Sequence, residues 1–453
     1  MTHLASAPST KAHRLATPKV RQILPPSSVD MGRVAAVILG GGQGTRLFPL
    51  TATRCKPAIS FGGRYRLIDV PISNCIHSNC RKIFVITQFL SSSLHQHIFQ
   101  TYRFDSFCSG FIEVIPAEQK PTAYDWFQGT ADAVRQNVNY FLDTPADYFL
   151  ILSGDQLYNM DFHEMVLFAQ QSDADLVIAT LPVTMSEAKR MGILQVDKKG
   201  AIVTFCEKPQ SNEQLSSLRT ATAVLEERLC SVDSSRQWLG SMGIYLFKRS
   251  ALFQLLQDDL REDFGKHLIP TKVQQGSACA YIYNGYWEDI GTIESFYHAN
   301  MALTSDDPPF RCHSEMRPIF SRQQHLPDAK FIQTFLSQAI VCEGSIIDGC
   351  EISNSIVGPR SIIGKGTLIR SSYVMGNDFY APPTSSSNLP ESFFIGSNCL
   401  ISKAVIDKHV HIGNAVRLTN EQQLQHYDSP HVYIRDGIII VPRGASLPDK
   451  FAL

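Results

Sequence analysis

The chain has 453 residues, with 41 lysines and arginines against 42 aspartates and glutamates, a formal charge of −1 when histidine is neutral. This balance argues against a dedicated nucleic-acid or membrane-surface binder, and no apolar run reaches the roughly 18 residues of a membrane span. The length predicts two or three domains. Eleven cysteines without a CxxC pair indicate reduced thiols, so we expect a soluble intracellular protein.

Residues 1–30 are polar and rich in Ser, Thr, Ala and Pro, with basic side chains and no acidic residue before Asp30. This composition predicts a flexible N-terminal tail. An organelle-targeting peptide has the same basic, acid-poor bias, so that alternative stays open.

Residues 31–305 alternate short apolar runs with amphipathic stretches. The apolar runs predict strands at 34–39, 83–87, 149–152, 176–181 and 243–247. Helices are expected at 131–142 and 162–171. Near-continuous apolar strands with helices between them predict an α/β domain whose mostly parallel sheet is covered on both faces. Ligands of such sheets bind beyond the carboxyl ends of the strands.

The C-terminal part, residues 334–453, changes to a period of six. This spacing fits neither an α-helix nor a simple strand and is typical of a parallel β-helix, whose coils bury aliphatic residues only against their neighbours. The proline-containing stretch 306–333 is expected to be the linker. The residues in the six-residue series are Ile340, Ile346 and Ile352, then Ile356, Ile362, Leu368 and Val374, then Phe394, Leu400, Ile406, Ile412 and Leu418.

The first expected strand runs into a glycine-rich turn, Leu39-Gly40-Gly41-Gly42-Gln43-Gly44-Thr45-Arg46-Leu47. Glycines let a backbone approach a ligand closely and present N–H groups to phosphate. The turn is neither a Walker A loop nor a GxGxxG motif, because Leu47 holds the third glycine position. Arg46 and Lys56 add cations that could neutralise a triphosphate and its leaving pyrophosphate. The alternative for each cation is a solvated surface charge.

The expected strand near residue 150 ends in Gly154-Asp155, which delivers a carboxylate to the ligand edge of the sheet. Mg²⁺ is held by one or two carboxylates together with phosphate oxygens, and Asp289 is the candidate second ligand. Either acid alone could be a helix cap or a turn residue.

Two further motifs carry functional groups. In Trp126–Val134, aromatic residues and a Gly-Thr turn precede a helix, although Thr130 as N-cap and Asp132 in the first turn would explain the pattern structurally. In Cys206–Pro209, Glu207 could accept hydrogen bonds from sugar hydroxyls beside a cation for phosphate, Lys208. A surface ion pair is the alternative.

Together these stretches resemble the glucose-1-phosphate adenylyltransferases, or ADP-glucose pyrophosphorylases, of the sugar nucleotidyltransferase family, over about residues 34–443. The resemblance implies a Rossmann-like α/β nucleotidyltransferase domain with a mostly parallel sheet, followed by a C-terminal left-handed parallel β-helix. Besides the glycine-rich turn, the blocks that carry it are Lys56–Ala58, Phe61–Gly63, Tyr65–Asp69, Ser73–Cys75, Trp126–Val134 and Asp263–Lys266.

The resemblance implies that ATP and glucose 1-phosphate react, with Mg²⁺, to ADP-glucose and pyrophosphate in glycogen or starch synthesis. Catalysis is then mainly positioning and charge neutralisation. By motif position, Arg46, Lys56 and Asp155 are implied to be catalytic, with Asp155 and Asp289 as metal ligands. The implied ATP-binding residues are Leu39, Gly40, Gly41, Gly42, Gly44, Thr45, Gly129 and Thr130. The implied glucose 1-phosphate residues are Phe127, Gly192, Glu207, Lys208 and Ser241.

The resemblance also implies a homotetramer with small-molecule allosteric effectors, without nucleic-acid or membrane partners. Gln88 and Trp126 match positions linked to communication between regulatory and substrate sites. Thr53 stands where one bacterial group has an activator-binding lysine, whereas Lys408 and Arg443 resemble C-terminal basic positions of plant and cyanobacterial relatives. This favours activation by 3-phosphoglycerate and inhibition by phosphate. A cytoplasmic location is expected, or a plastid if the tail is a transit peptide.

Two departures from the family pattern leave questions open. Gln156 replaces the more usual histidine of a Gly-Asp-His run, and residues 117–120 differ from the usual Gln-rich loop. The rival interpretations are a non-catalytic regulatory subunit, a nucleotidyltransferase that uses another nucleotide, and an acyltransferase acting through the hexapeptide repeat. Because Arg46, Lys56 and Asp155 are all present, the sequence favours a catalytic chain.

Overall fold

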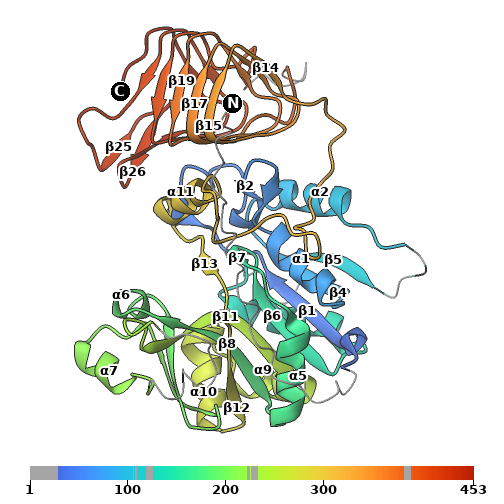
Figure 1. Ribbon diagram of the computed structural model, residues 1–453. Coiled ribbons are helices and arrows are strands. Elements are labelled where there is room, and N and C mark those ends of the chain that lie inside the picture. The colour runs from blue at the N-terminus through green and yellow to red at the C-terminus, as the bar shows by residue number, and fades with distance from the viewer. Residues whose placement is uncertain are drawn as a thin grey trace, which may run out of the picture.

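A computed structural model describes residues 29–105, 107, 110–118, 126–221, 225, 233–381 and 389–453. The expected tail lies outside these ranges except for residues 29–30, as do residues 119–120 of the loop that departs from the family pattern. An α/β domain forms the lower part of the molecule and a β-helix the upper part (Figure 1). No helix in the described ranges is long and apolar enough to cross a membrane.

The N-terminal domain is built on a nine-stranded sheet with the order β10-β9-β11-β6-β1-β4-β5, in which β8 also pairs with β11 and β12. β1 lies parallel between β4 and β6, and the sheet is mostly parallel, with β10 and β11 opposed to the other strands. The strands are β1 (Val34–Leu39), β4 (Lys82–Thr87), β5 (Phe111–Pro116), β6 (Tyr148–Ser153), β8 (Leu176–Val183), β9 (Gly192–Val196), β10 (Ile202–Glu207), β11 (Trp238–Lys248) and β12 (Ala278–Ile282).

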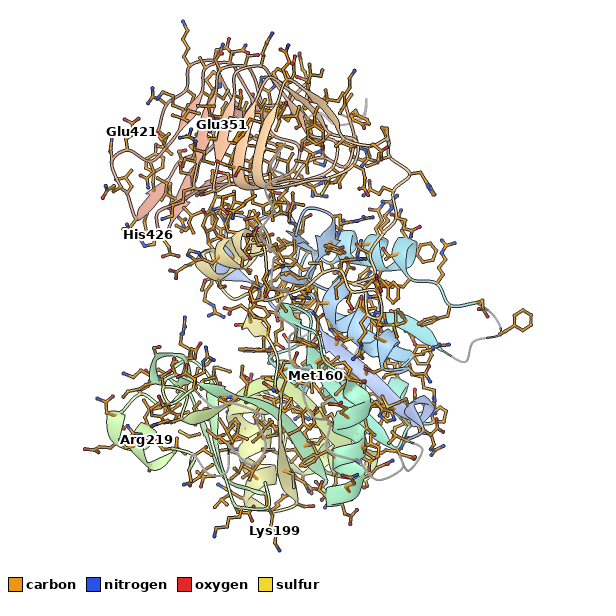
Figure 2. All side chains as sticks on the ribbon, viewed as in Figure 1. Met160, Lys199, Arg219, Glu351, Glu421 and His426 are labelled. Carbon is orange, nitrogen blue, oxygen red and sulfur yellow. The ribbon has the colours of Figure 1, made fainter. Side chains whose placement is uncertain are left out.

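Helices cover both faces of this sheet, as the apolar runs predict. Val34, Ala36 and Ile38 of β1 belong to one apolar core, and Ala35 and Val37 belong to the other. The first core includes α1 (Asp69–His77), α2 (Ser92–Thr101) and α5 (Phe162–Ser172). The second includes α3 (Thr130–Gln136), α4 (Val138–Leu142), α9 (Arg249–Asp258) and α10 (Ile269–Gln274). Met160, in the first core, marks the middle of the domain (Figure 2).

The prediction of a single helix over residues 131–142 is wrong, because the chain forms two helices separated at Asn137. This residue has φ −106° and ψ 13°, and its side-chain amide donates to the carbonyl of Ala133. A side chain that bonds the preceding turn while the backbone leaves helical angles interrupts the ladder. The remaining short elements are η1 (Met31–Arg33), η2 (Thr45–Leu47), η3 (Lys56–Ala58), β2 (Ser60–Phe61), β3 (Tyr65–Arg66), β7 (Gln156–Tyr158), α6 (Met185–Ala188), α7 (Asn212–Ser217), η4 (Phe264–Leu268), β13 (Trp287–Asp289) and α11 (Ile293–Ala302).

The C-terminal domain is a parallel β-helix. Successive coils align Ile352, Ile369, Ile401 and Leu418 in one column by parallel pairing. A hairpin, β25 (His426–Asp428) and β26 (Tyr433–Arg435), packs antiparallel at its far end. The coil strands are β14 (Lys330–Ile332), β15 (Phe335–Val341), β16 (Ile346–Asp348), β17 (Glu351–Val357), β18 (Ile362–Ile363), β19 (Leu368–Arg370), β20 (Tyr373–Val374), β21 (Leu400–Ser402), β22 (Ala404–Ile406), β23 (His411–Ile412), β24 (Arg417–Leu418), β27 (Ile438–Val441) and β28 (Ser446–Leu447).

The six-residue series identifies the coils but is one residue out of register at several of them. Ile362 and Leu368 are only half-buried, whereas the residues that follow them, Ile363 and Ile369, are buried. Each short strand points alternate side chains inward and outward. Where two aliphatic residues are adjacent, the sequence therefore does not show which of them points into the core. β14 lies inside the stretch that the sequence assigns to the linker, and it pairs with β16 as part of the first coil.

The two domains share an apolar core. Phe61 of β2 and Phe296 of α11 pack in the same buried cluster as Tyr373, Val405 and Ile440 of the β-helix. Figure 1 shows α11 and β2 between the sheet and the coils. The β-helix is therefore held against the segment that follows the glycine-rich turn.

Candidate active site

The glycine-rich turn is fixed between the ends of two parallel strands. The N–H of Gly40 donates to the carbonyl of Ile86 at 2.8 Å, and the N–H of Gly154 donates to that of Leu39 at 3.0 Å. Gly44 has φ +65°, a left-handed conformation that favours glycine. Within the described part of the chain, a Cβ added at Gly42 would meet no atom within 4 Å. The turn therefore has an open side where a ligand can approach its backbone.

Two cations and two carboxylates meet beside this turn. Lys56 Nζ contacts Asp155 and lies 3.6 Å from Asp289. The carboxylates come together because β7, directly after Asp155, pairs antiparallel with β13, placing Gln156 opposite Asp289. A Cβ added at Gly291 would lie 3.5 Å from a guanidinium nitrogen of Arg46. The structure therefore brings together the four charged residues predicted for this site.

The pKa shifts show how strongly these charges interact. Burial lowers the pKa of the Lys56 ammonium, but Asp155 and Asp289 outweigh burial and raise the pKa overall. Burial raises the pKa of Asp289, and the neighbouring Asp155 carboxylate raises it further against the opposing effect of Lys56. Two carboxylates crowded in this way form a site where a further cation reduces repulsion.

The donor set fits a hard divalent ion such as Mg²⁺. Asp155 and Asp289 offer carboxylate oxygens, and Mg²⁺ takes one or two of these while keeping water and phosphate oxygens as its other ligands. Within the described ranges there is no group of three or more His, Cys, Asp or Glu side chains that could hold a metal by protein ligands alone. Water and the phosphate oxygens of a bound nucleotide would supply its other ligands.

A second group of predicted residues lies at the end of the β9–β10 pair. Gly192 pairs with Glu207, and a Cβ at Gly192 would lie 2.8 Å from Glu207 Oε2. Lys208 Nζ lies 3.6 Å from Glu207 and its backbone has φ +48°. Burial raises the pKa of Glu207, and Lys208 opposes the rise. Ser241 lies on β11, and Phe127 packs, partly buried, against the second core.

The block Asp263–Lys266 also belongs to this group, although the sequence analysis assigned it no role. A Cβ at Gly265 would lie 3.4 Å from Glu207 Oε2, and Asp263 and Lys266 both act on the pKa of Glu207. The signal that could have identified the block was its appearance among the family-like motifs. Its contact with Glu207 depends on the packing of η4 and was not visible in the sequence.

Thr130 does not cap its helix, so the structural alternative given for this residue does not hold. The N-cap of α3 is Gly129, which has no side-chain cap bond. The Thr130 hydroxyl instead accepts a hydrogen bond from the N–H of Phe264 at 3.0 Å. The N–H of Ala131 donates to the carbonyl of Glu262 at 2.8 Å. The start of α3 is thus held by the segment before η4.

The two residues assigned to communication lie near the glycine-rich turn. A Cβ at Gly41 would lie 3.4 Å from Gln88 Cβ. The next residue, Phe89, stacks on Trp126 with ring centroids 6.3 Å apart. Trp126 itself is half exposed. Gln88 and Phe89 therefore link the turn to the Trp126 segment.

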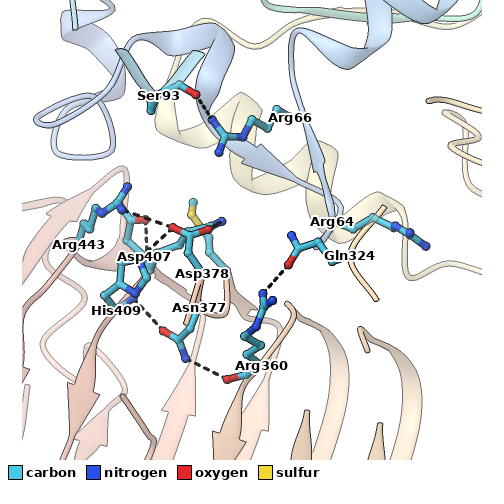
Figure 3. A network of polar contacts seen from close by, with 12 residues as sticks. Arg64, Arg66, Ser93, Gln324, Arg360, Asn377, Asp378, Asp407, His409 and Arg443 are labelled. Atoms are coloured by element: carbon cyan, nitrogen blue, oxygen red, sulfur yellow. Dashed lines mark hydrogen bonds and ion pairs between the residues drawn. The ribbon is translucent and has the colours of Figure 1, made fainter. Parts of the chain in front are cut away.

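The predicted effector residues lie where the β-helix meets the N-terminal domain. Asp378 accepts from Lys408 Nζ at 2.6 Å, from His409 Nε2 at 2.9 Å and from Arg443 at 3.4 Å. Burial alone would raise the pKa of Asp378, but Lys408 and His409 hold it well below its ordinary value. Arg66 of the N-terminal domain feels the charge of Asp378 electrostatically, and its guanidinium donates to the carbonyl of Ser93 (Figure 3).

This cluster is connected through neighbouring residues to the segment that carries Lys56. Arg54, two residues before Lys56, forms a buried ion pair with Asp407 of the β-helix. Lys408 follows Asp407 in the chain, and burial lowers its pKa while Asp378 opposes the change. A cation-rich interdomain cluster is thus attached to the lysine that lies between the two carboxylates.

Comparison with known families agrees with both halves of this arrangement. Residues 35–306 match the nucleotidyl transferase family, and the chain belongs to that family. Residues 324–452 match the GLGC left-handed parallel beta-helix domain. These two domains in this order are the architecture of glucose-1-phosphate adenylyltransferase, or ADP-glucose pyrophosphorylase. The fold class and the enzyme class predicted from the sequence are confirmed. Nucleotidyltransferases of this family generally use a divalent metal ion.

Proposed function

We propose that the chain transfers the adenylyl group of ATP to glucose 1-phosphate, giving ADP-glucose and pyrophosphate, as the regulated step of glycogen or starch synthesis. The observation that carries the proposal is the position of Lys56 between Asp155 and Asp289, beside Arg46 and the open glycine-rich turn. Such a site places cationic side chains and metal-binding carboxylates where a triphosphate must be held and its pyrophosphate released.

In this reaction a phosphate oxygen of glucose 1-phosphate attacks the α-phosphorus of ATP. A new oxygen–phosphorus bond forms there while the bond from the α-phosphorus to the bridging oxygen breaks, and pyrophosphate leaves with that electron pair. Lys56 and Arg46 stabilise the negative charge that builds up on the transferring and leaving groups. Asp155 and Asp289 would hold Mg²⁺, which supplies further neutralisation when bound. The turn at residues 40–44 positions the phosphates through its backbone N–H groups.

The sugar phosphate is proposed to bind at the β9–β10 end. Glu207 accepts hydrogen bonds from sugar hydroxyls, and Lys208 pairs with the phosphate. Phe127 and Ser241 contribute an apolar surface and a hydroxyl. Support comes from the shared location of Gly192, Glu207 and Lys208, where the Glu207 carboxylate packs so closely on Gly192 that a Cβ there would lie 2.8 Å from it. The fixed placement of both substrates supplies most of the proposed catalysis.

The test is pyrophosphate release by the purified chain with Mg²⁺ and glucose 1-phosphate, comparing ATP with UTP, dTTP, CTP and GTP. ATP-selective turnover is expected. Preference for another nucleotide would keep the family and reassign the product. Silence with every nucleotide, in a chain that still binds effectors and alters the kinetics of a partner subunit, would favour the regulatory-subunit alternative.

Regulation is proposed to act through the interdomain cluster around Lys408 and Arg443. We expect 3-phosphoglycerate to activate and phosphate to inhibit, since both are anions of the size and charge that clustered Lys and Arg side chains bind. Unchanged turnover across 3-phosphoglycerate concentrations would contradict this. A homotetramer is proposed as the assembly, to be measured by sedimentation. The proposed location is the cytoplasm, or a plastid if the basic N-terminal segment, outside the described residues, is a transit peptide.

A further inference from the structure

Gln156 adjoins both carboxylate residues of the proposed site. It follows Asp155 directly and opens β7, where its backbone pairs with Asp289 of β13. Its side chain is buried, with 6% of the residue exposed. Any group bonded to this side chain is therefore fixed relative to both Asp155 and Asp289.

The side chain of Gln156 holds an irregular part of β11. Its Nε2 donates to the carbonyl of Met242 at 2.8 Å. The pairing of β11 with β8 shifts register between Ser241 and Tyr245. Gly243, in this stretch, has φ +70°, and its N–H donates to the hydroxyl of Ser241 at 3.2 Å. The amide thus ties the segment that carries Ser241 to the strand that follows Asp155.

Packing alone does not explain an amide at this position. Among the residues that the structure describes, the buried Oε1 of Gln156 has no hydrogen-bond partner, and a buried acceptor without a partner costs free energy that an apolar side chain of the same size would avoid. The Met242 carbonyl can only accept, so the side chain must provide an N–H donor. A histidine ring can provide one too, which explains how the more usual Gly-Asp-His run could serve the same purpose.

We propose that Gln156 is a positioning residue that sets the sugar-phosphate strand, through Met242 and Ser241, at a fixed place relative to the metal-binding carboxylates. The proposal rests on the proposed function, because it assigns Ser241 to glucose 1-phosphate. Losing the bond lets the β11 irregularity move, so the sugar phosphate is held less well while the nucleotide contacts at the glycine-rich turn stay intact.

The experiment compares Gln156→Leu with Gln156→His and with a control on α1, Asn74, whose side chain bonds the other end of β7. Asn74 is also a buried amide, and it bonds the carbonyl of Tyr158 and the N–H of Met160, away from β11. For Gln156→Leu we expect the KM for glucose 1-phosphate to rise about 10-fold, the scale of one lost hydrogen bond, with the KM for ATP within about 2-fold. Gln156→His should restore most of the glucose 1-phosphate affinity.

The control Asn74→Ala should unfold at a lower temperature without a selective change in the KM for glucose 1-phosphate. If Gln156→Leu lowers thermal stability in the same way but leaves that KM unchanged, the side chain is only structural and the proposal is overturned. Equal increases in both KM values would overturn it as well. So would a Gln156→His variant that folds but does not recover the affinity for glucose 1-phosphate. The wild-type chain is assayed first, because absence of turnover there would contradict the proposed function and not the role of Gln156.

Discussion

The guanidinium of Arg54 and the carboxylate of Asp407 meet inside the protein, at 2.6 and 2.7 Å, although 353 positions separate them in the sequence. Both side chains are almost completely buried, at 2% and 1% exposure. Arg54 belongs to the segment that leads to Lys56, and Asp407 belongs to the β-helix. The pair therefore joins the β-helix to the segment that carries Lys56 by a buried ion pair.

Replacing Arg54 with methionine should destabilise the chain by about 3–5 kcal/mol, because the Asp407 carboxylate would be left buried without its partner. The double variant Arg54→Met, Asp407→Leu should recover much of the loss, since neither charge then remains. Urea denaturation measures both. If the double variant is no more stable than Arg54→Met, the buried charge is not the cause of the destabilisation.

Lys56→Met should lower kcat about 10²–10³-fold, the scale for removing one group that stabilises developing charge. Methionine has a side chain of similar length to fill the place of Lys56, which is only 12% exposed, and urea denaturation checks that the fold persists. Pyrophosphate release with saturating ATP and glucose 1-phosphate gives kcat. Lys198→Met, at an exposed turn, is the matched control and should leave kcat unchanged; a loss of only a few-fold at Lys56 would remove it from the proposed catalytic set.

Asp69 should make stability depend on pH in the acid range. Burial alone would raise its pKa, but hydrogen bonds and charge from His97, together with bonds from Ser321 and Tyr102, hold the pKa below its ordinary value. A carboxylate whose pKa is lowered by folding contributes stability at pH values above its pKa in the unfolded chain, which is about 4. This contribution is lost as the pH falls through the pKa of the folded state.

Asp69→Asn should therefore be less stable than wild type by about 2–4 kcal/mol at pH 7, and the difference should shrink as the pH is lowered from about 5 to 3. Urea unfolding across this pH range measures it. Asp307→Asn, an exposed aspartate bonded to Arg311, is the control and should show little difference at any pH. A constant gap between Asp69→Asn and wild type would contradict the assigned cause.

Asp378→Asn should increase the affinity for anionic effectors. The Asp378 carboxylate pairs with Lys408, His409 and Arg443. It therefore repels any anion that approaches these side chains. Without its charge, the half-saturating concentration of 3-phosphoglycerate should fall about 5- to 10-fold, equivalent to about 1–1.4 kcal/mol.

Activity measured against 3-phosphoglycerate concentration tests this prediction. Glu351→Gln, which removes an exposed carboxylate paired with Arg370 on the β-helix, should leave the response unchanged. An increase in the half-saturating concentration for Asp378→Asn would mean that the carboxylate organises the cations more than it competes for them.

Local sequence patterns predicted much of the fold. They failed where packing against elements that are distant in the sequence determines the local structure. The apolar runs located β1, β4, β6, β8 and part of β11, because a buried strand needs apolar residues on both faces. Thr130 was a plausible cap by composition, yet its hydroxyl bonds Phe264 from a segment far along the chain. The inward residue of each coil was also ambiguous wherever two aliphatic residues are adjacent.

By itself, the sequence determined the order of the two domains, the glycine-rich turn and the acid at the end of β6, because each depends on neighbours within a few residues. Only the tertiary structure decided that Asp289 joins Asp155, that Gln156 bonds Met242, and that Arg54 meets Asp407. These contacts depend on strand register and domain packing. Many sequences of the same periodicity could place the same side chains elsewhere. The physical reason is that the packing of the complete fold, and not a local sequence pattern, determines which of these side chains meet.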